Sequence, residues 1–248
     1  MRGAGAYCSM RRVAAAFACS LALCGPAMAI VGGALTAEAT FARRTVMVLS
    51  SRGACTGAVL ARDLVLTAAH CVVNATNIRI GGRHTGKMFH LAEVTESAPH
   101  PHYGAGSNES DLALLKLSKP LSTHAPAFYQ QRIVAIGDRL TVIGYGTTTF
   151  GDRKTEDVPR MAMLVVTYQS RRVIYLTDRT NWSKEKISGC GGDSGAPIFA
   201  ARSGVPMLVA ILRGSSRDCD NITVATPLAP HHDWIMETAK KLGAPLEP

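Results

Sequence analysis

The chain has 248 residues and a formal net charge of +9, and 47% of its residues are hydrophobic. After the first 29 residues no apolar run approaches the roughly 20 residues of a membrane-spanning helix, so we expect no stable membrane insertion. The sequence has no repeat with a period of about 20–50 residues. The positive net charge is the single feature that would favour nucleic-acid binding, and it is not sufficient by itself, so we expect no nucleic-acid partner.

The first 29 residues have the pattern of a secretory signal peptide. Three arginines give a basic start, residues 13–24 are mostly apolar, and Ala27-Met28-Ala29 has the small-x-small pattern of a cleavage site. Removing these 29 of the 248 residues would leave 219 and would lower the net charge from +9 to +6, because three arginines are lost. We therefore expect a secreted protein, extracellular or periplasmic, that begins at Ile30.

The rest of the chain carries many short strand signals bounded by Gly, Pro, Asn or Ser. They cover 45–49, 57–60, 64–67, 77–80, 112–117, 140–143, 161–166, 197–199, 207–212 and 223–225. This pattern is typical of an all-β barrel or sandwich. One helix is expected at about 231–243, because Trp234, Ile235, Ala239 and Leu242 recur at helical spacing.

Four cysteines follow the leader: Cys55, Cys71, Cys190 and Cys219. An even number of cysteines in an exported chain indicates disulfide bonds, and four cysteines allow three pairings. No Cys-x-x-Cys or His-x-x-x-His spacing occurs, so we expect neither a metal site nor a cofactor.

Three separate segments contain the residue types of an activated serine nucleophile. Ala68-Ala69-His70-Cys71 places a base beside a cysteine, Asp111 begins an apolar run, and Gly191-Gly192-Asp193-Ser194-Gly195 places a hydroxyl on a glycine-rich turn. Histidine titrates near neutral pH and can take the proton of a serine hydroxyl. Each residue taken singly has an ordinary structural explanation, but the set occurs in the order His, Asp, Ser.

These segments, together with Ile30-Val31-Gly32-Gly33 at the expected new N-terminus, resemble the trypsin/chymotrypsin family of serine proteases. The order His, Asp, Ser is that of chymotrypsin-type enzymes and differs from subtilisin and the α/β-hydrolases. The resemblance implies two six-stranded antiparallel β-barrels, at about 30–125 and 126–230, with the active site in the cleft between them. It also implies a serine-type endopeptidase that acts on proteins or peptides.

The resemblance assigns catalytic roles. His70 would accept the Ser194 proton and later give it to the leaving amine, while Asp111 would hold the imidazole in the right tautomer. The backbone N–H groups of Gly192 and Ser194 would form the oxyanion hole. The disulfides would be Cys55–Cys71, beside the histidine, and Cys190–Cys219, beside the substrate pocket.

The same resemblance implies that the freed α-amino group of Ile30 pairs with Asp193, the acid before the nucleophile. Because leader removal and this activation involve the same bond, we predict that export itself activates the enzyme, without a separate zymogen. Two disulfides that are common in larger relatives lack their cysteines, which suggests a simpler, bacterial secreted member of the family.

The primary substrate pocket would have Ser188 at its base, where a hydroxyl does not favour Lys or Arg substrates. Gly189 and Gly214 would leave room, so we expect cleavage after apolar residues of medium or large size. Other outcomes stay open, and they concern residues along the pocket wall. Leu212 or Arg213 could reshape the wall, Thr223 could restrict the pocket to small side chains, and Asp218 or Asp220 could supply a displaced acid.

A second function is compatible with the same fold. A catalytically silent protein could use its basic surface on anionic partners such as polysaccharides, although Lys and Arg usually form just a solvated face. Binding alone needs neither Ser194 nor His70, so the intact residue set favours the enzyme. We expect a monomer.

Overall fold

The computed structural model describes residues 30–32, 34–85, 87–104, 109–129, 131–152, 155–179, 186–202 and 205–247. The expected signal peptide lies outside these residues. The described helices are α1 (Ala39–Ala42), η1 (Ala69–Cys71), η2 (Ala229–His231) and α2 (His232–Lys241). None of these described helices has the length and hydropathy that a membrane span requires.

The first barrel is a closed antiparallel sheet with the strand order β2-β3-β4-β7-β6-β5. Its strands are β2 (Thr45–Ser50), β3 (Gly53–Ala61), β4 (Leu64–Thr67), β5 (Arg79–His84), β6 (Lys87–Pro99) and β7 (Ala113–Leu117). All four residues of β4 are buried, because its two faces both pack: Val65 lies in one hydrophobic cluster, and Leu64 and Leu66 lie in another. Its position matters for function, since the chain leaves β4 directly into the turn that carries His70.

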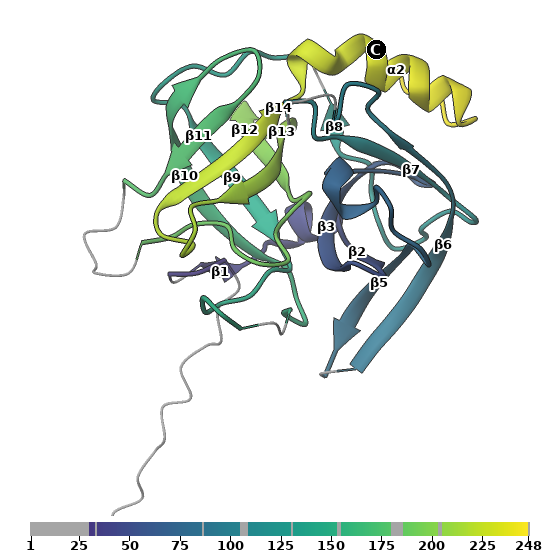
Figure 1. The fold of residues 1–248 in the computed structure, drawn as a ribbon, viewed down its shortest axis with the longest axis horizontal. Coiled ribbons are helices and arrows are strands. Elements are labelled where there is room, and N and C mark those ends of the chain that lie inside the picture. The colour runs from purple at the N-terminus through teal and green to yellow at the C-terminus, as the bar shows by residue number, and fades with distance from the viewer. Residues whose placement is uncertain are drawn as a thin grey trace, which may run out of the picture.

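The second barrel contains β9 (Arg139–Gly144), β10 (Arg160–Gln169), β11 (Ile174–Thr177), β12 (Pro197–Arg202), β13 (Val205–Ser215) and β14 (Ile222–Pro227). These six strands close on themselves because β10 pairs with both β9 and β11. Two short strands pair with the barrel but lie outside its closed ring: β1 (Leu35–Thr36) pairs with β10, and β8 (Phe128–Tyr129) pairs with β13. The two barrels lie side by side (Figure 1).

A shared hydrophobic cluster joins the barrels to helix α2, the yellow helix along one edge of Figure 1. The first barrel contributes Leu66 and Leu114, the second contributes Phe199 and Ile211, and the helix contributes Ile235. Each of these side chains is 0–1% exposed. Burial of apolar surface of this kind stabilises the contact by roughly 25 cal/mol for each Å².

The architecture confirms the expectation of two six-stranded antiparallel barrels followed by a C-terminal helix. All ten expected strands overlap observed ones. Four observed strands were not predicted from the sequence: β1, β6, β8 and β11. Strand β6 is 13 residues long, but its residues are mostly exposed and lack an apolar alternation, so only its pairing with β5 and β7 makes it a strand.

Candidate active site

His70 and Asp111 meet at one end of the first barrel. The Nδ1 atom of His70 lies 2.7 Å from Oδ2 of Asp111, and the backbone N–H of His70 donates to Oδ1 at 2.9 Å. Asp111 is 2% exposed, whereas the His70 side chain is 32% exposed. Both carboxylate oxygens are therefore engaged by one histidine, and an acceptor at Nδ1 places the ring hydrogen there and leaves Nε2 as the free base.

The turn that carries Ser194 belongs to the second barrel but docks on the first. The backbone N–H of Thr56, in β3, donates to the Ser194 carbonyl oxygen at 2.8 Å. The Thr56 hydroxyl donates to the Gly192 carbonyl oxygen at 2.9 Å and accepts the N–H of Tyr145 at 3.1 Å. These bonds hold the turn against the barrel that supplies His70 and Asp111.

Gly195 shows how close this docking is. Its φ is +83°, and a Cβ at this position would lie 2.1 Å from both the Thr56 carbonyl oxygen and the Thr67 hydroxyl. A side chain is therefore excluded by conformation and by space. Thr67 lies only three residues before His70, so the same close approach brings the Ser194 turn to the histidine segment.

Two disulfide bonds flank this junction, Cys55–Cys71 and Cys190–Cys219, which is the pairing that the resemblance implied. The Sγ atom of Cys71 lies 3.8 Å from the Ser194 carbonyl oxygen. Cys55, His70 and Cys71 have ligand atoms within 4.8 Å of one another, the one group with metal-ligand spacing in the described part of the chain. Both sulfurs are bonded to each other, so this group offers no thiolate to a metal.

Asp193 lies in a pocket built from glycines. A Cβ on Gly144 would lie 2.0 Å from its Oδ1 atom, and a Cβ on Gly146 would lie 2.3 Å from its carboxyl carbon. The carboxylate accepts the N–H of Gly146 at 2.8 Å and that of Cys190 at 2.9 Å. Gly192, one residue earlier, has a φ of +92°, a backbone conformation that few other residues adopt.

Asp193 has no cationic partner among the described residues. It is 0% exposed, and burial raises its pKa to about 7, against the opposing effect of the two backbone N–H groups. A buried carboxylate without a counter-charge is costly, and protonation or a cation would relieve that cost.

Ile30 is buried beside the same region. It is 0% exposed and packs in the core of the second barrel with residues such as Val142 and Ala196. Its neighbour Val31 forms an antiparallel bridge with Ser188. The φ of Ile30 is +55°, which is a strained conformation for a β-branched residue that is acylated at its nitrogen.

Four of the expected substrate-pocket residues close against one another. Ser188 and Thr223 are 0% exposed and Leu212 is 1% exposed. The Thr223 Oγ1 atom accepts the N–H of Gly189 at 3.0 Å, and a Cβ on Gly189 would lie 2.6 Å from a Leu212 methyl carbon. The Ser188 hydroxyl donates to the Cys219 carbonyl oxygen. The base of this region is filled by the protein itself.

The remaining pocket residues lie nearer the surface. Arg213 is partly exposed, and a Cβ on Gly214 would meet nothing within 4 Å. Asp218 and Asp220 are exposed, so neither supplies an acid at the buried base.

Several residues that organise the site were missed by the sequence analysis. Thr56 links the two barrels through both its backbone and its hydroxyl, and the glycines at 144 and 146 make room for Asp193. No local motif singles out a threonine just before a predicted strand or a glycine just after one. Their roles come from contacts between distant parts of the chain. Thr56 bonds to residues about 90 or more positions away, and Gly146 bonds to Asp193, about 50 positions away.

Known protein sequences resemble this chain over most of its length. The sequence model of the family described as trypsin matches residues 30–235. Granzyme M of Homo sapiens is 31% identical over 209 residues, which are 73% of this chain and 77% of the relative. Kallikrein-15 of Homo sapiens is 26% identical over 214 residues, or 75% and 82% of the two chains. These relatives are animal proteins, so the bacterial origin suggested by the cysteine count stays a prediction.

Solved structures share the fold. The serine protease neuropsin, expressed in the limbic system of mouse brain, has a TM-score of 0.68 at 19% identity, covering 83% of this chain and 98% of its own. An inactivated protease paralogue of the scabies mite has a TM-score of 0.66 at 24% identity, covering 84% and 99%. At these identities the likeness concerns the fold alone.

Proposed function

Because this chain belongs to the trypsin family and is a serine-type endopeptidase, we propose that His70, Asp111 and Ser194 are its catalytic triad. The observation that carries the proposal is the pair of hydrogen bonds from one histidine to a buried aspartate, at 2.7 and 2.9 Å. The docking of the Ser194 turn on Thr56 supports it. Protein or peptide substrates follow from the family.

In the proposed mechanism Asp111 holds the Nδ1 hydrogen of His70, and Nε2 takes the proton of the Ser194 hydroxyl as the oxygen attacks the scissile carbonyl. The same nitrogen then gives its proton to the leaving amine, and water hydrolyses the acyl-enzyme by the reverse steps. The N–H groups of Gly192 and Ser194 would stabilise the oxyanion, and one such donor lowers the barrier by about 2.7–4 kcal/mol in a comparable enzyme.

Activation by cleavage before Ile30 is supported by two features of the uncut chain. Asp193 is buried with no cationic partner in the part of the chain that the structure describes, and Ile30 is held at a φ of +55°. Cutting the bond before Ile30 would remove the acyl group that makes this φ unfavourable, and would create a positive charge for Asp193. We propose that the cut removing the signal peptide performs both steps and that the protein is secreted.

The closed base of the pocket narrows the proposed specificity. The large apolar residue expected from Gly189 and Gly214 would have to displace Leu212 or Thr223, both of which are closed to solvent. We propose that the enzyme cleaves after small apolar residues such as alanine. This is the alternative expected from the sequence if Thr223 restricts the pocket to small side chains.

The test uses the protein that begins at Ile30 and a library of peptide substrates. Ser194→Ala should abolish cleavage to background, while Ser118→Ala, at an exposed serine, should retain it. Activity in Ser194→Ala equal to the parent would defeat the proposed triad. Cleavage after Arg or Lys would defeat the proposed specificity.

N-terminal sequencing of the secreted, active protein tests the activation step separately. The expected start is Ile30. Full activity in a protein that begins upstream of Ile30 would refute the single-cut scheme.

A further inference from the structure

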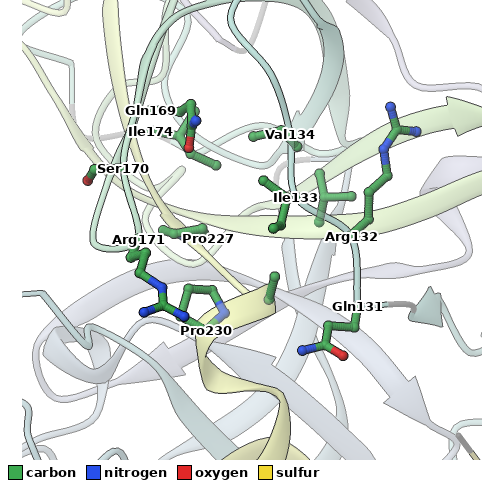
Figure 2. Close-up of a pocket in the computed structure, with 12 residues that line it drawn as sticks. Gln131, Arg132, Ile133, Val134, Gln169, Ser170, Arg171, Ile174, Pro227 and Pro230 are labelled. Carbon is green, nitrogen blue, oxygen red and sulfur yellow. The ribbon is translucent and has the colours of Figure 1, made fainter.

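A cavity of about 230 Å³ opens on the second barrel at a place that none of the candidate catalytic or substrate-pocket residues lines. Figure 2 shows its walls: the segment 131–134 on one side, the β10–β11 turn at 169–171 on the other, and Pro227 and Pro230 below. Ile174 and Val209 complete the interior.

The floor of the cavity belongs to the core of the second barrel. Val134, Ile174 and Val209 are 5%, 1% and 1% exposed and are part of its hydrophobic cluster. At the mouth, Ile133 is 79% exposed, the largest exposed fraction among the large hydrophobic residues described. An apolar group placed here would cover Ile133 and contact the core at the same time, as ligands do in concave, mostly apolar sites.

The rim is positively charged. Arg132 and Arg171 line the cavity from two sides (Figure 2). Arg132 lies 3.5 Å from Asp138, which is not a lining residue. Arg171 is exposed and has no ion-pair partner among the described residues. The turn beneath it is held in place, because the Ser170 N–H donates to the Val173 carbonyl oxygen at 2.9 Å.

A second hollow adjoins the first and shares Arg171 and Pro230 with it. This hollow contains its own ion pair, between Arg172 and Glu109 at 3.0 Å. The arginine on that side is therefore neutralised locally. Arg171 lines both hollows, and no acidic residue that lines either of them forms an ion pair with it.

We propose that this cavity binds a small monocarboxylate with an apolar body. The apolar body would lie on Ile174 and Val209, and the carboxylate would accept hydrogen bonds from the Arg171 guanidinium, whose planar fork matches a carboxylate. If each non-hydrogen atom with its hydrogens takes about the volume of one water molecule, about 30 Å³, a cavity of about 230 Å³ holds about eight such atoms. Hexanoate has this size and chemistry.

The test is a calorimetric titration of the intact protein with hexanoate, hexanol and hexylamine. Hexanoate should bind at one site, with hexanol weaker and hexylamine without measurable binding. Arg171→Gln should weaken hexanoate binding about tenfold or more, because a charge-assisted hydrogen bond is lost. Ala229 also lines the cavity, so Ala229→Leu should block the cavity without changing its charge.

Arg62→Gln, at an exposed arginine in the first barrel, is the matched control and should leave hexanoate binding unchanged. Absence of hexanoate binding at millimolar concentrations would overturn the proposal. Equal binding of hexanoate and hexanol, or equal hexanoate binding in the parent, Arg171→Gln and Ala229→Leu proteins, would also overturn it. The readout is binding, so a failure of the proposed triad would leave this result intact.

Discussion

The two barrels differ in whether the candidate site residues that they contribute already have their bonding partners. In the first barrel, His70 and Asp111 already make both of their hydrogen bonds, and the aspartate is buried with its partner in place. In the second barrel, Asp193 is buried without a cation among the described residues and Ile30 is strained. In the proposed mechanism, folding therefore completes the His70–Asp111 pair, whereas the turn that carries Ser194 depends on cleavage before Ile30.

This difference indicates where control of activity resides. A switch that acted on the His70–Asp111 pair would have to break a charge-assisted hydrogen bond in a buried setting. A switch that acts on Asp193 only has to supply a missing charge. We therefore propose that the second barrel is the part of the molecule in which a single cut changes activity.

The largest expected effect tests the completed pair. Asp111→Asn should lower kcat by about 10⁴-fold, as the equivalent change does in a chymotrypsin-type enzyme. The amide offers one acceptor oxygen, whereas His70 presents both a backbone and a ring N–H. Asp63→Asn, at a partly exposed acid paired with Lys116, should change peptide cleavage little. A loss of less than tenfold in Asp111→Asn would contradict the assigned role.

A smaller loss is expected from Asp193→Asn in the protein that begins at Ile30. Removing one partner of a buried ion pair costs about 3–5 kcal/mol, which corresponds to a loss of roughly 150-fold to 5,000-fold in kcat/KM. In the uncut chain the same change should leave thermal stability equal or higher, because no cation is lost there. Equal effects on the cut and uncut proteins would show that Asp193 has no role in activation.

In the substrate pocket, the expected effect is a change of about tenfold in the preference between two substrate residues. Thr223→Gly should raise cleavage after leucine relative to alanine by about tenfold, because one or two apolar groups are worth roughly 1–3 kcal/mol in a pocket. Thr223→Ser keeps the oxygen that accepts the Gly189 N–H and should shift the ratio less. Kinetics on paired peptide substrates give the ratio, and an unchanged ratio in Thr223→Gly would place the specificity elsewhere.

The smallest expected effect concerns a histidine pair that joins the end of β6 to η2. His100 accepts the His102 N–H at Nδ1 (3.2 Å), so its Nε2 carries hydrogen and donates to Nδ1 of His231 at 3.3 Å. Burial, and then the nearby charges of His231 and His102, lowers the pKa of His100 to about 4. The unfolded chain, with a pKa of 6.5, therefore binds more protons between these values.

Because the unfolded chain binds more protons, the free energy of unfolding should fall as the pH drops from 6.5 towards 4. His100 should contribute at most about 1 kcal/mol per pH unit to this fall. His100→Gln should remove this part of the slope, while His90→Gln, at an exposed histidine, should retain it. Urea titrations across this pH range measure the slope. Equal slopes in all three proteins would contradict the contribution of His100.

Local sequence determined much of this protein. The strand signals and the order of His70, Asp111 and Ser194 were sufficient to anticipate an all-β fold and the family, because alternating apolar residues and short motifs express local preferences. The C-terminal helix was anticipated for the same reason, and the observed bounds, His232–Lys241, lie inside the expected range.

Tertiary structure alone decided how the site is assembled and how wide its pocket is. Thr56 links the two barrels, and Gly144 with Gly146 leaves room for Asp193. Leu212 and Thr223 fill the space that Gly189 had suggested was open. Each of these outcomes depends on contacts between residues distant in the chain. A glycine in the sequence reveals that a side chain is absent, but only the packed structure shows which neighbouring atom occupies that space.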